Sequence, residues 1–148
     1  MIAQTLAQIY ERDLNKLKEE LSLYKNEGTI WEVKDGISNS AGNLALHLVG
    51  NLKHFIGAGL GKTDYIRNRD SEFTLKNIPR KDLLEDIDNT IGILKSAIGK
   101  LSDEDFSKDF PVEIQNKIQR TDYALFHLLS HLSYHLGQIN YHRRLILD

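Results

Sequence analysis

Histidine is the residue type whose placement in this sequence suggests chemistry. Four of the six histidines fall in one stretch, residues 121–147, with steps of four, four and seven residues between them. The four are His127, His131, His135 and His142. At about 100° per residue, these steps place all four imidazoles within an arc of about 80° on one side of a helix. The other two, His47 and His54, lie seven residues apart and also share a helical face.

Two histidines at positions i and i+4 of a helix can present ring nitrogens to one metal ion. The third ligand must come from another element, and His47 is the obvious candidate. Three neutral imidazoles leave one coordination position open, as in catalytic sites. Spacing alone does not distinguish the pair His127 and His131 from the pair His131 and His135. In the alternative interpretation, the histidines hydrogen-bond to neighbours or face water.

The composition narrows the classes of protein. A net charge of −2 and a pI near 6.3 argue against nucleic acid as a partner. Because the chain has no cysteine, disulfides and thiolate ligands are excluded, and nitrogen and oxygen atoms would hold any metal. The first residues do not resemble a signal peptide, and the apolar residues 44–60 are too interrupted by polar ones to cross a membrane. We expect one cytoplasmic domain over residues 1–148.

Apolar residues at helical spacing predict four substantial helices. They extend over residues 2–24, from 41 to about 59, from Pro79 to about 101, and over 121–147. The third helix carries a regular seam of Leu84, Ile87, Ile91, Leu94, Ile98 and Leu101. No sustained alternation typical of strands is present. The expected fold class is therefore all-α, a four-helix bundle with long connecting loops.

Local signals refine the helix ends and the connections. Ser40 and Thr121 are placed to cap the second and last helices, and Gly28 to end the first. Residues 60–78 lack periodicity and are predicted as a long loop, whose charged residues form a solvated network or, alternatively, bind an anion or close a lid. The sequence SDEDF predicts a short helical turn, and VEIQNKIQ a small hairpin.

The second helix also carries a polar stripe beside its apolar body. The stripe consists of Asn43, His47, Asn51 and His54. Polar groups on a largely buried helix need partners, because an unpaired polar group in a core is costly. We therefore expect this stripe to face other polar residues, and the alternative is that it faces solvent. In the last helix, Ser130, Ser133 and Gly137 form a strip of small residues suited to close packing, either within the bundle or against a second subunit.

Several familiar motifs are absent. The sequence has no Glu-x-x-His pair of di-iron bundles, no HExxH, no GxSxG and no glycine-rich phosphate loop. A mononuclear site of three histidines from two helices remains. The segments HLSYHLGQI, residues 131–139, and NLALHLVGNLKHFI upstream of it resemble the DinB-like superfamily, which includes the YfiT-type proteins. The resemblance covers nearly the whole chain, and the SNSAGNL and RNRDSEF segments are similar to an uncharacterised branch.

That resemblance implies more than the spacing does. It implies that His47, His131 and His135 bind a divalent metal, nickel or zinc, and that the protein is a homodimer. Relatives of this kind include bacillithiol-dependent thiol transferases and a mycothiol-dependent isomerase. The expected function is a metal-dependent enzyme that acts on a small electrophilic molecule, as a thiol S-transferase or in a hydrolase-like reaction. The alternative is a non-catalytic, stress-related interaction module in which the histidines are structural.

Four further residues are candidates for supporting roles. Asn51 and Gln138 are expected to orient an imidazole or the substrate. His54 and His142 are expected to act as additional polar or acid–base groups near the metal.

Overall fold

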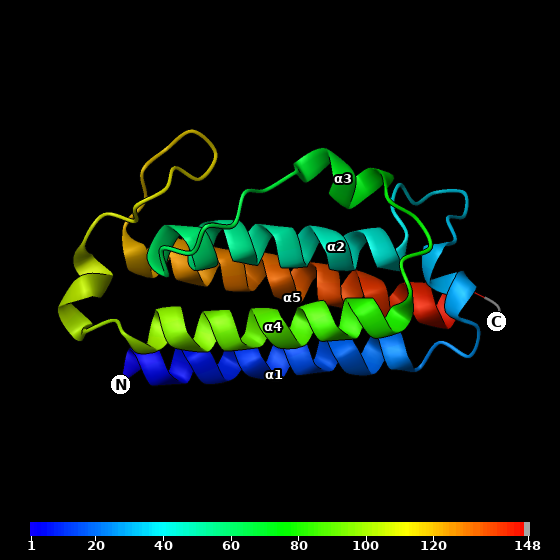
Figure 1. Ribbon diagram of the computed structural model, residues 1–148, viewed down its shortest axis with the longest axis horizontal. Helices are drawn as coiled ribbons and strands as arrows, with labels where there is room; N and C mark the ends of the chain where they lie inside the picture. The colour runs from blue at the N-terminus through cyan, green and yellow to red at the C-terminus, as the bar shows by residue number, and fades with distance from the viewer. Residues whose placement is uncertain (147–148) are drawn as a thin grey trace.

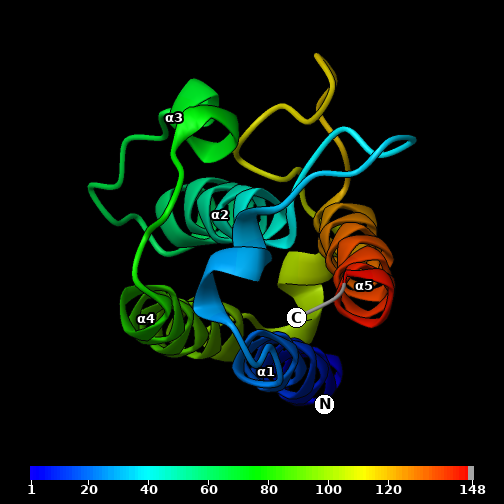
Figure 2. The ribbon, with the colours of Figure 1, turned by 90° about the vertical axis from the view of Figure 1, so that its right-hand side faces the viewer.

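Four long helices lie side by side in the computed structural model, which describes residues 1–146 (Figure 1). They are α1 (Ile2–Ser22), α2 (Ala41–Leu52), α4 (Arg80–Gly99) and α5 (Thr121–Leu145). A fifth, short helix, α3 (Arg69–Thr74), lies outside this group against α2, as the end-on view shows (Figure 2). Residues 1–146 contain no β-strand, which confirms the all-α expectation. Residues 147–148 lie outside the described part, and residue 147 is the predicted end of the last helix.

The core is formed where the apolar stripes of the long helices meet. From α1 it receives Leu6, Tyr10, Leu14, Leu17 and Leu21. From α4 it receives Leu83, Ile87, Thr90, Leu94, Ala97 and Ile98. The buried face of α4 is rotated slightly from the predicted seam. Three seam residues, Leu84, Ile91 and Leu101, are only half-buried at the edge of that face. The 3.6-residue period makes the buried stripe drift around the helix, and the pattern of large apolar residues alone misses Thr90 and Ala97.

The start of α2 is as predicted, but its end differs. Ser40 Oγ accepts a hydrogen bond from the Asn43 backbone N–H at 3.1 Å, which confirms Ser40 as the N-cap. From Lys53 to Leu60 the helix continues with π-helical hydrogen bonding. At the end of this segment the Gly61 Cα approaches the Gly57 carbonyl oxygen, which would lie only 2.7 Å from a Cβ at residue 61. Glycine is needed there for the wider turns to close.

The segment predicted as a loop contains α3. Asn68 caps this helix, because its side chain accepts a hydrogen bond from the Ser71 backbone N–H. A helix of six residues is too short to show an apolar period, which is why the sequence pattern does not reveal it. The expectation of a solvated charge network holds only in part. Arg67 and Glu72 form an ion pair against α2, whereas Arg69 and Asp70 are exposed.

The remaining connections match the predictions in part. A 3₁₀ turn at Asp103–Ser107 confirms the SDEDF expectation, and isolated bridges join Asp109 to Arg120 and Ile114 to Lys117 around the predicted hairpin. Thr121 does not cap α5: it is the first helical residue, and its hydroxyl donates to the Lys108 carbonyl. Gly28 does not end α1, which stops at Ser22, six residues earlier.

None of the described helices is long and apolar enough to cross a membrane. One face of α5 is left uncovered by the other described residues. Large side chains on that face, Tyr123, Phe126, Tyr134, Tyr141 and Leu145, are all at least half exposed. Ser130, Ser133 and Gly137, the predicted strip of small residues, are exposed between them. Residues 1–146 therefore do not enclose α5 by themselves.

Candidate metal centre

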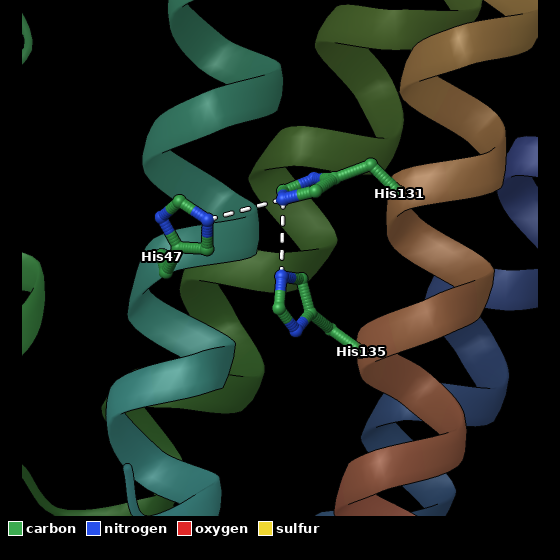
Figure 3. A group of neighbouring side chains, drawn as sticks. All are labelled: His47, His131 and His135. Carbon is green, nitrogen blue, oxygen red and sulfur yellow. Dashed lines mark hydrogen bonds between the residues drawn. The ribbon is translucent and has the colours of Figure 1, made fainter. Parts of the chain in front are cut away.

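Three histidines converge between α2 and α5 (Figure 3). His131 Nε2 lies 3.1 Å from His47 Nε2 and 3.0 Å from His135 Nε2. Each residue offers one ring nitrogen, and the three offered atoms all lie within 4.8 Å of one another. His47 is buried, and the two α5 histidines are half-buried. The cluster thus joins the three residues that the resemblance singled out, although spacing left His127 as an equal candidate.

The other three histidines lie away from the cluster for a reason of helix geometry. His54 follows His47 by seven residues, and His142 follows His135 by seven, so each is displaced by about 10 Å along its helix. His127 lies one turn, about 6 Å, before His131. There its ring stacks on Tyr123, with ring centroids 6.0 Å apart. A shared helical face is therefore not enough, because a site also requires the same level along the axis.

His142 has a structural role instead of the expected acid–base role near the metal. Its Nε2 donates to the Glu32 carbonyl oxygen at 2.8 Å, because a carbonyl can only accept. Its Nδ1 lies 2.6 Å from the Tyr24 hydroxyl. The buried imidazole thus fastens the end of α5 to the chain that follows α1. His54 likewise makes no contact with the cluster, and its ring packs edge-on against Phe55.

Each outer histidine of the cluster is held through its second ring nitrogen. His47 Nδ1 lies 3.0 Å from Glu72 Oε1 and 3.4 Å from Arg67 Nη2. Because a carboxylate only accepts, Nδ1 carries the hydrogen and donates it to Glu72, and the longer Arg67 contact is not a hydrogen bond. His135 Nδ1 lies 2.6 Å from Gln138 Oε1, which is also an acceptor. Gln138 therefore accepts a hydrogen bond from one imidazole of the cluster.

Glu72 is the residue of this site that the sequence analysis missed. It projects from α3 and is buried against α2, where Gly50 makes room for it: a Cβ at residue 50 would lie 1.9 Å from Glu72 Oε2. Arg67 holds both carboxylate oxygens, at 2.8 Å from Nε and 2.9 Å from Nη2. Asn43 Nδ2 donates to the backbone carbonyls of Glu72 and Leu75, each at 2.9 Å. Two residues of the polar stripe, Asn43 and His47, thus find partners in α3 and at its C-terminal end.

Asn51 does not orient a cluster histidine. Its side chain is only 8% exposed, and its Oδ1 has no hydrogen-bond partner. Asn51 lies one turn beyond His47 on the same face of α2. It is therefore displaced from the cluster along the helix axis, as His54 is.

The hydrogen-bond roles leave lone pairs facing one another. With hydrogen on their Nδ1 atoms, neutral His47 and His135 both present an unprotonated Nε2 toward His131. A single hydrogen on His131 Nε2 can satisfy only one of these two nitrogens. His131 Nδ1 is buried without a partner, so a hydrogen placed on this atom would also be unsatisfied. His131 Nε2 would then be unprotonated and would face the unprotonated Nε2 atoms of His47 and His135. No arrangement of protons on three neutral imidazoles satisfies this cluster.

A divalent cation fits this set of donors. Two nitrogens that each lie about 2.1 Å from one ion are about 3.0–3.4 Å apart when the angle between them is about 90–110°. The separations of 3.1 Å and 3.0 Å from His131 Nε2 lie in that range, and the third pair of donor nitrogens, those of His47 and His135, lies within 4.8 Å. The carboxylate on His47 Nδ1 is also the outer partner that metal-binding histidines commonly have.

Burial sets the protonation states at neutral pH. Burial, followed by the charges of His135, His47, His127 and Arg67, lowers the pKa of His131 to about 4. Burial also lowers the pKa of His135, although the hydrogen bond to Gln138 opposes this shift. For Glu72, burial alone would raise the pKa, but hydrogen bonds from His47 and Arg67 outweigh it and hold the pKa below its ordinary value. His131 and His135 are therefore neutral and Glu72 is charged.

These shifts predict that acid destabilises the metal-free protein. The folded-state pKa of His131 is about 4, below its ordinary value of 6.5, so the unfolded chain binds more protons between these values. The free energy of unfolding should therefore fall as the pH is lowered from about 6.5 to about 4. Urea titrations at several pH values measure this slope. His131→Gln should reduce it, whereas His127→Gln should not, and equal slopes in wild type and His131→Gln would contradict the assignment.

Together, the fold and the site define an all-α protein with a three-histidine cluster between two of its long helices. The chain belongs to the family described as "Protein of unknown function (DUF1572)", whose model matches residues 3–148. No curated protein matches the sequence.

Proposed function

We propose that this protein is a metal-dependent enzyme with one mononuclear site formed by His47, His131 and His135, on a four-helix bundle of the DinB-like type. The observation that carries the proposal is the convergence of three ring nitrogens whose lone pairs no proton arrangement satisfies. Nickel or zinc suits the nitrogen donors. The alternative, a stress-related module with structural histidines, is less favoured, because purely structural histidines would be satisfied by hydrogen bonds, as His142 is.

The chain's residues have distinct parts in this proposal. A divalent cation held by three imidazoles keeps a position open and lowers the pKa of the water or thiol that enters it. Glu72 and Gln138 fix the ring orientation and the tautomer of His47 and His135. The reaction class we propose is transfer of a low-molecular-weight thiol to a small electrophilic substrate, or a related hydrolysis. The cytoplasm, where such thiols occur, is the proposed location.

Elemental analysis tests the metal proposal directly. The full chain, purified without a histidine tag, is expected to contain about one nickel or zinc per chain, because a single cluster of three imidazoles provides one site. Dialysis against a chelator and titration with each metal then give the stoichiometry and the preference. Protein that neither contains nor takes up a divalent metal would favour the structural alternative.

We also propose a homodimer that uses the exposed face of α5. Large aromatic side chains surround a strip of small residues on this face, and Tyr134 and Tyr141 are 66% and 68% exposed. Such a face can pack closely against a second copy about a twofold axis. Light scattering at micromolar concentration is expected to give twice the chain mass of 17.0 kDa. Phe126→Glu should shift the protein toward the monomer, and a wild-type monomer would contradict the proposal.

A further inference from the structure

A cavity of about 750 Å³ lies beside the histidine cluster. One wall is the segment of residues 34–39, and the other is the C-terminal half of α5. The volume is in the range of sites that bind small organic molecules. Its apolar lining includes Ile37, Leu44, Leu145 and Ile146, and Tyr134 and Tyr141 add two aromatic rings.

The cavity and the cluster share His135. This residue lines the cavity, and its Nε2 lies 3.0 Å from His131 Nε2 within the cluster. Gln138 also lines the cavity while its Oε1 holds His135 Nδ1. A molecule in the cavity would therefore lie next to the proposed metal and against the residue that orients one of its ligands.

The charges of the lining favour a neutral occupant. Lys34 and Asp35 are the only residues with a formal charge along the described wall, and they have opposite signs. Lys34 Nζ also donates to the Leu145 carbonyl oxygen at 3.1 Å, so one of its hydrogen-bond donors is already used within the protein. A phosphate or polycarboxylate normally requires several cationic groups or a fork of guanidinium donors. His142 at this wall is already hydrogen-bonded on both ring nitrogens.

We propose that this cavity binds the electrophilic substrate of the metal site, and that the substrate is a neutral molecule with an aromatic or branched aliphatic body. The apolar walls and the two tyrosines hold the body, and the reacting end lies at His135 and Gln138. This inference rests on the proposed function, because a molecule beside His135 is a substrate only if His135 holds the reactive metal.

Binding of 2-naphthol to the full-length protein tests the cavity. This neutral aromatic probe should bind saturably, and 2-naphthyl phosphate should bind at least about tenfold more weakly because its charge lacks partners. Ser38→Trp fills the cavity from its exposed wall and should weaken naphthol binding at least about tenfold. Ser107→Trp, an exposed position that does not line the cavity, is the matched control and should bind like wild type.

Ile37→Ala provides a second variant that does not depend on how Ser38→Trp folds. It removes an apolar side chain from the cavity wall at an exposed position outside α5 and should also weaken naphthol binding. Any of three results would overturn the proposal. The wild type does not bind naphthol saturably, both cavity variants bind naphthol as tightly as the wild type, or naphthyl phosphate binds as tightly as naphthol.

A paramagnetic measurement separates this proposal from the proposed function. In protein loaded with Co²⁺, the protons of bound naphthol should relax faster than in protein loaded with Zn²⁺, because the cavity adjoins His135. If the protein binds metal but the naphthol protons show no such effect, the cavity is not the substrate site of the metal centre. If the protein binds no metal yet naphthol follows the variant pattern, the metal function fails while the neutral apolar binding site stands.

Discussion

His131→Ala is expected to abolish stoichiometric metal binding. His131 Nε2 is within 3.1 Å of both other ring nitrogens, so it is the central donor of the cluster. Without it, His47 and His135 remain on different helices with only two imidazoles to offer. Removing an outer hydrogen-bond partner of a metal ligand typically weakens metal affinity by roughly 10–100-fold. Removing the ligand His131 itself should weaken the affinity by more than that. Metal content per chain after dialysis, and competition with a chromophoric chelator, measure the change.

His127→Ala is the matched control for this experiment. It removes the same side chain from the same helix one turn earlier, at a position where the imidazole stacks on Tyr123 and not in the cluster. It should keep wild-type metal content. If His127→Ala loses metal while His131→Ala retains it, the ligand assignment is wrong, and if neither variant changes a bound metal, that metal is held elsewhere.

Glu72→Ala is expected to damage both the fold and the site. The change leaves the largely buried Arg67 guanidinium without its counter-ion, a defect that typically costs about 3–5 kcal/mol in the free energy of unfolding. It also removes the acceptor of His47 Nδ1, so metal affinity should fall by about 10–100-fold. Urea unfolding of metal-free protein and chelator competition measure the two effects separately.

Two further variants separate the sources of the effect. Asp70→Ala removes an exposed carboxylate from the same short helix and should change neither quantity, so an equal effect of Asp70→Ala and Glu72→Ala would contradict the role of Glu72. Gly50→Ala keeps the carboxylate but places a methyl group where Glu72 Oε2 lies. It should lower metal affinity by displacing Glu72 from His47.

The sequence by itself determined the long helices and the faces of their histidines. Residues repeating at three and four positions predict α1 and α4, and the Ser40 N-cap fixes where α2 begins. These features depend on neighbours within about one turn of the same helix, which the sequence contains directly. The small residues Ser130, Ser133 and Gly137 of α5 also indicated a strip for close packing, but not what covers it.

Tertiary structure decided which histidines meet and what supports them. Periodicity gives the angle of a side chain around a helix, but not its level against a neighbouring helix, so spacing left His127 equal to His135. The packing of α2 against α5 brings His47 level with His131 and His135. Glu72 reaches His47 across 25 residues of sequence, from a helix too short to have a period, and through the space above Gly50. Contacts of this kind depend on how the chain returns on itself, which no local pattern encodes.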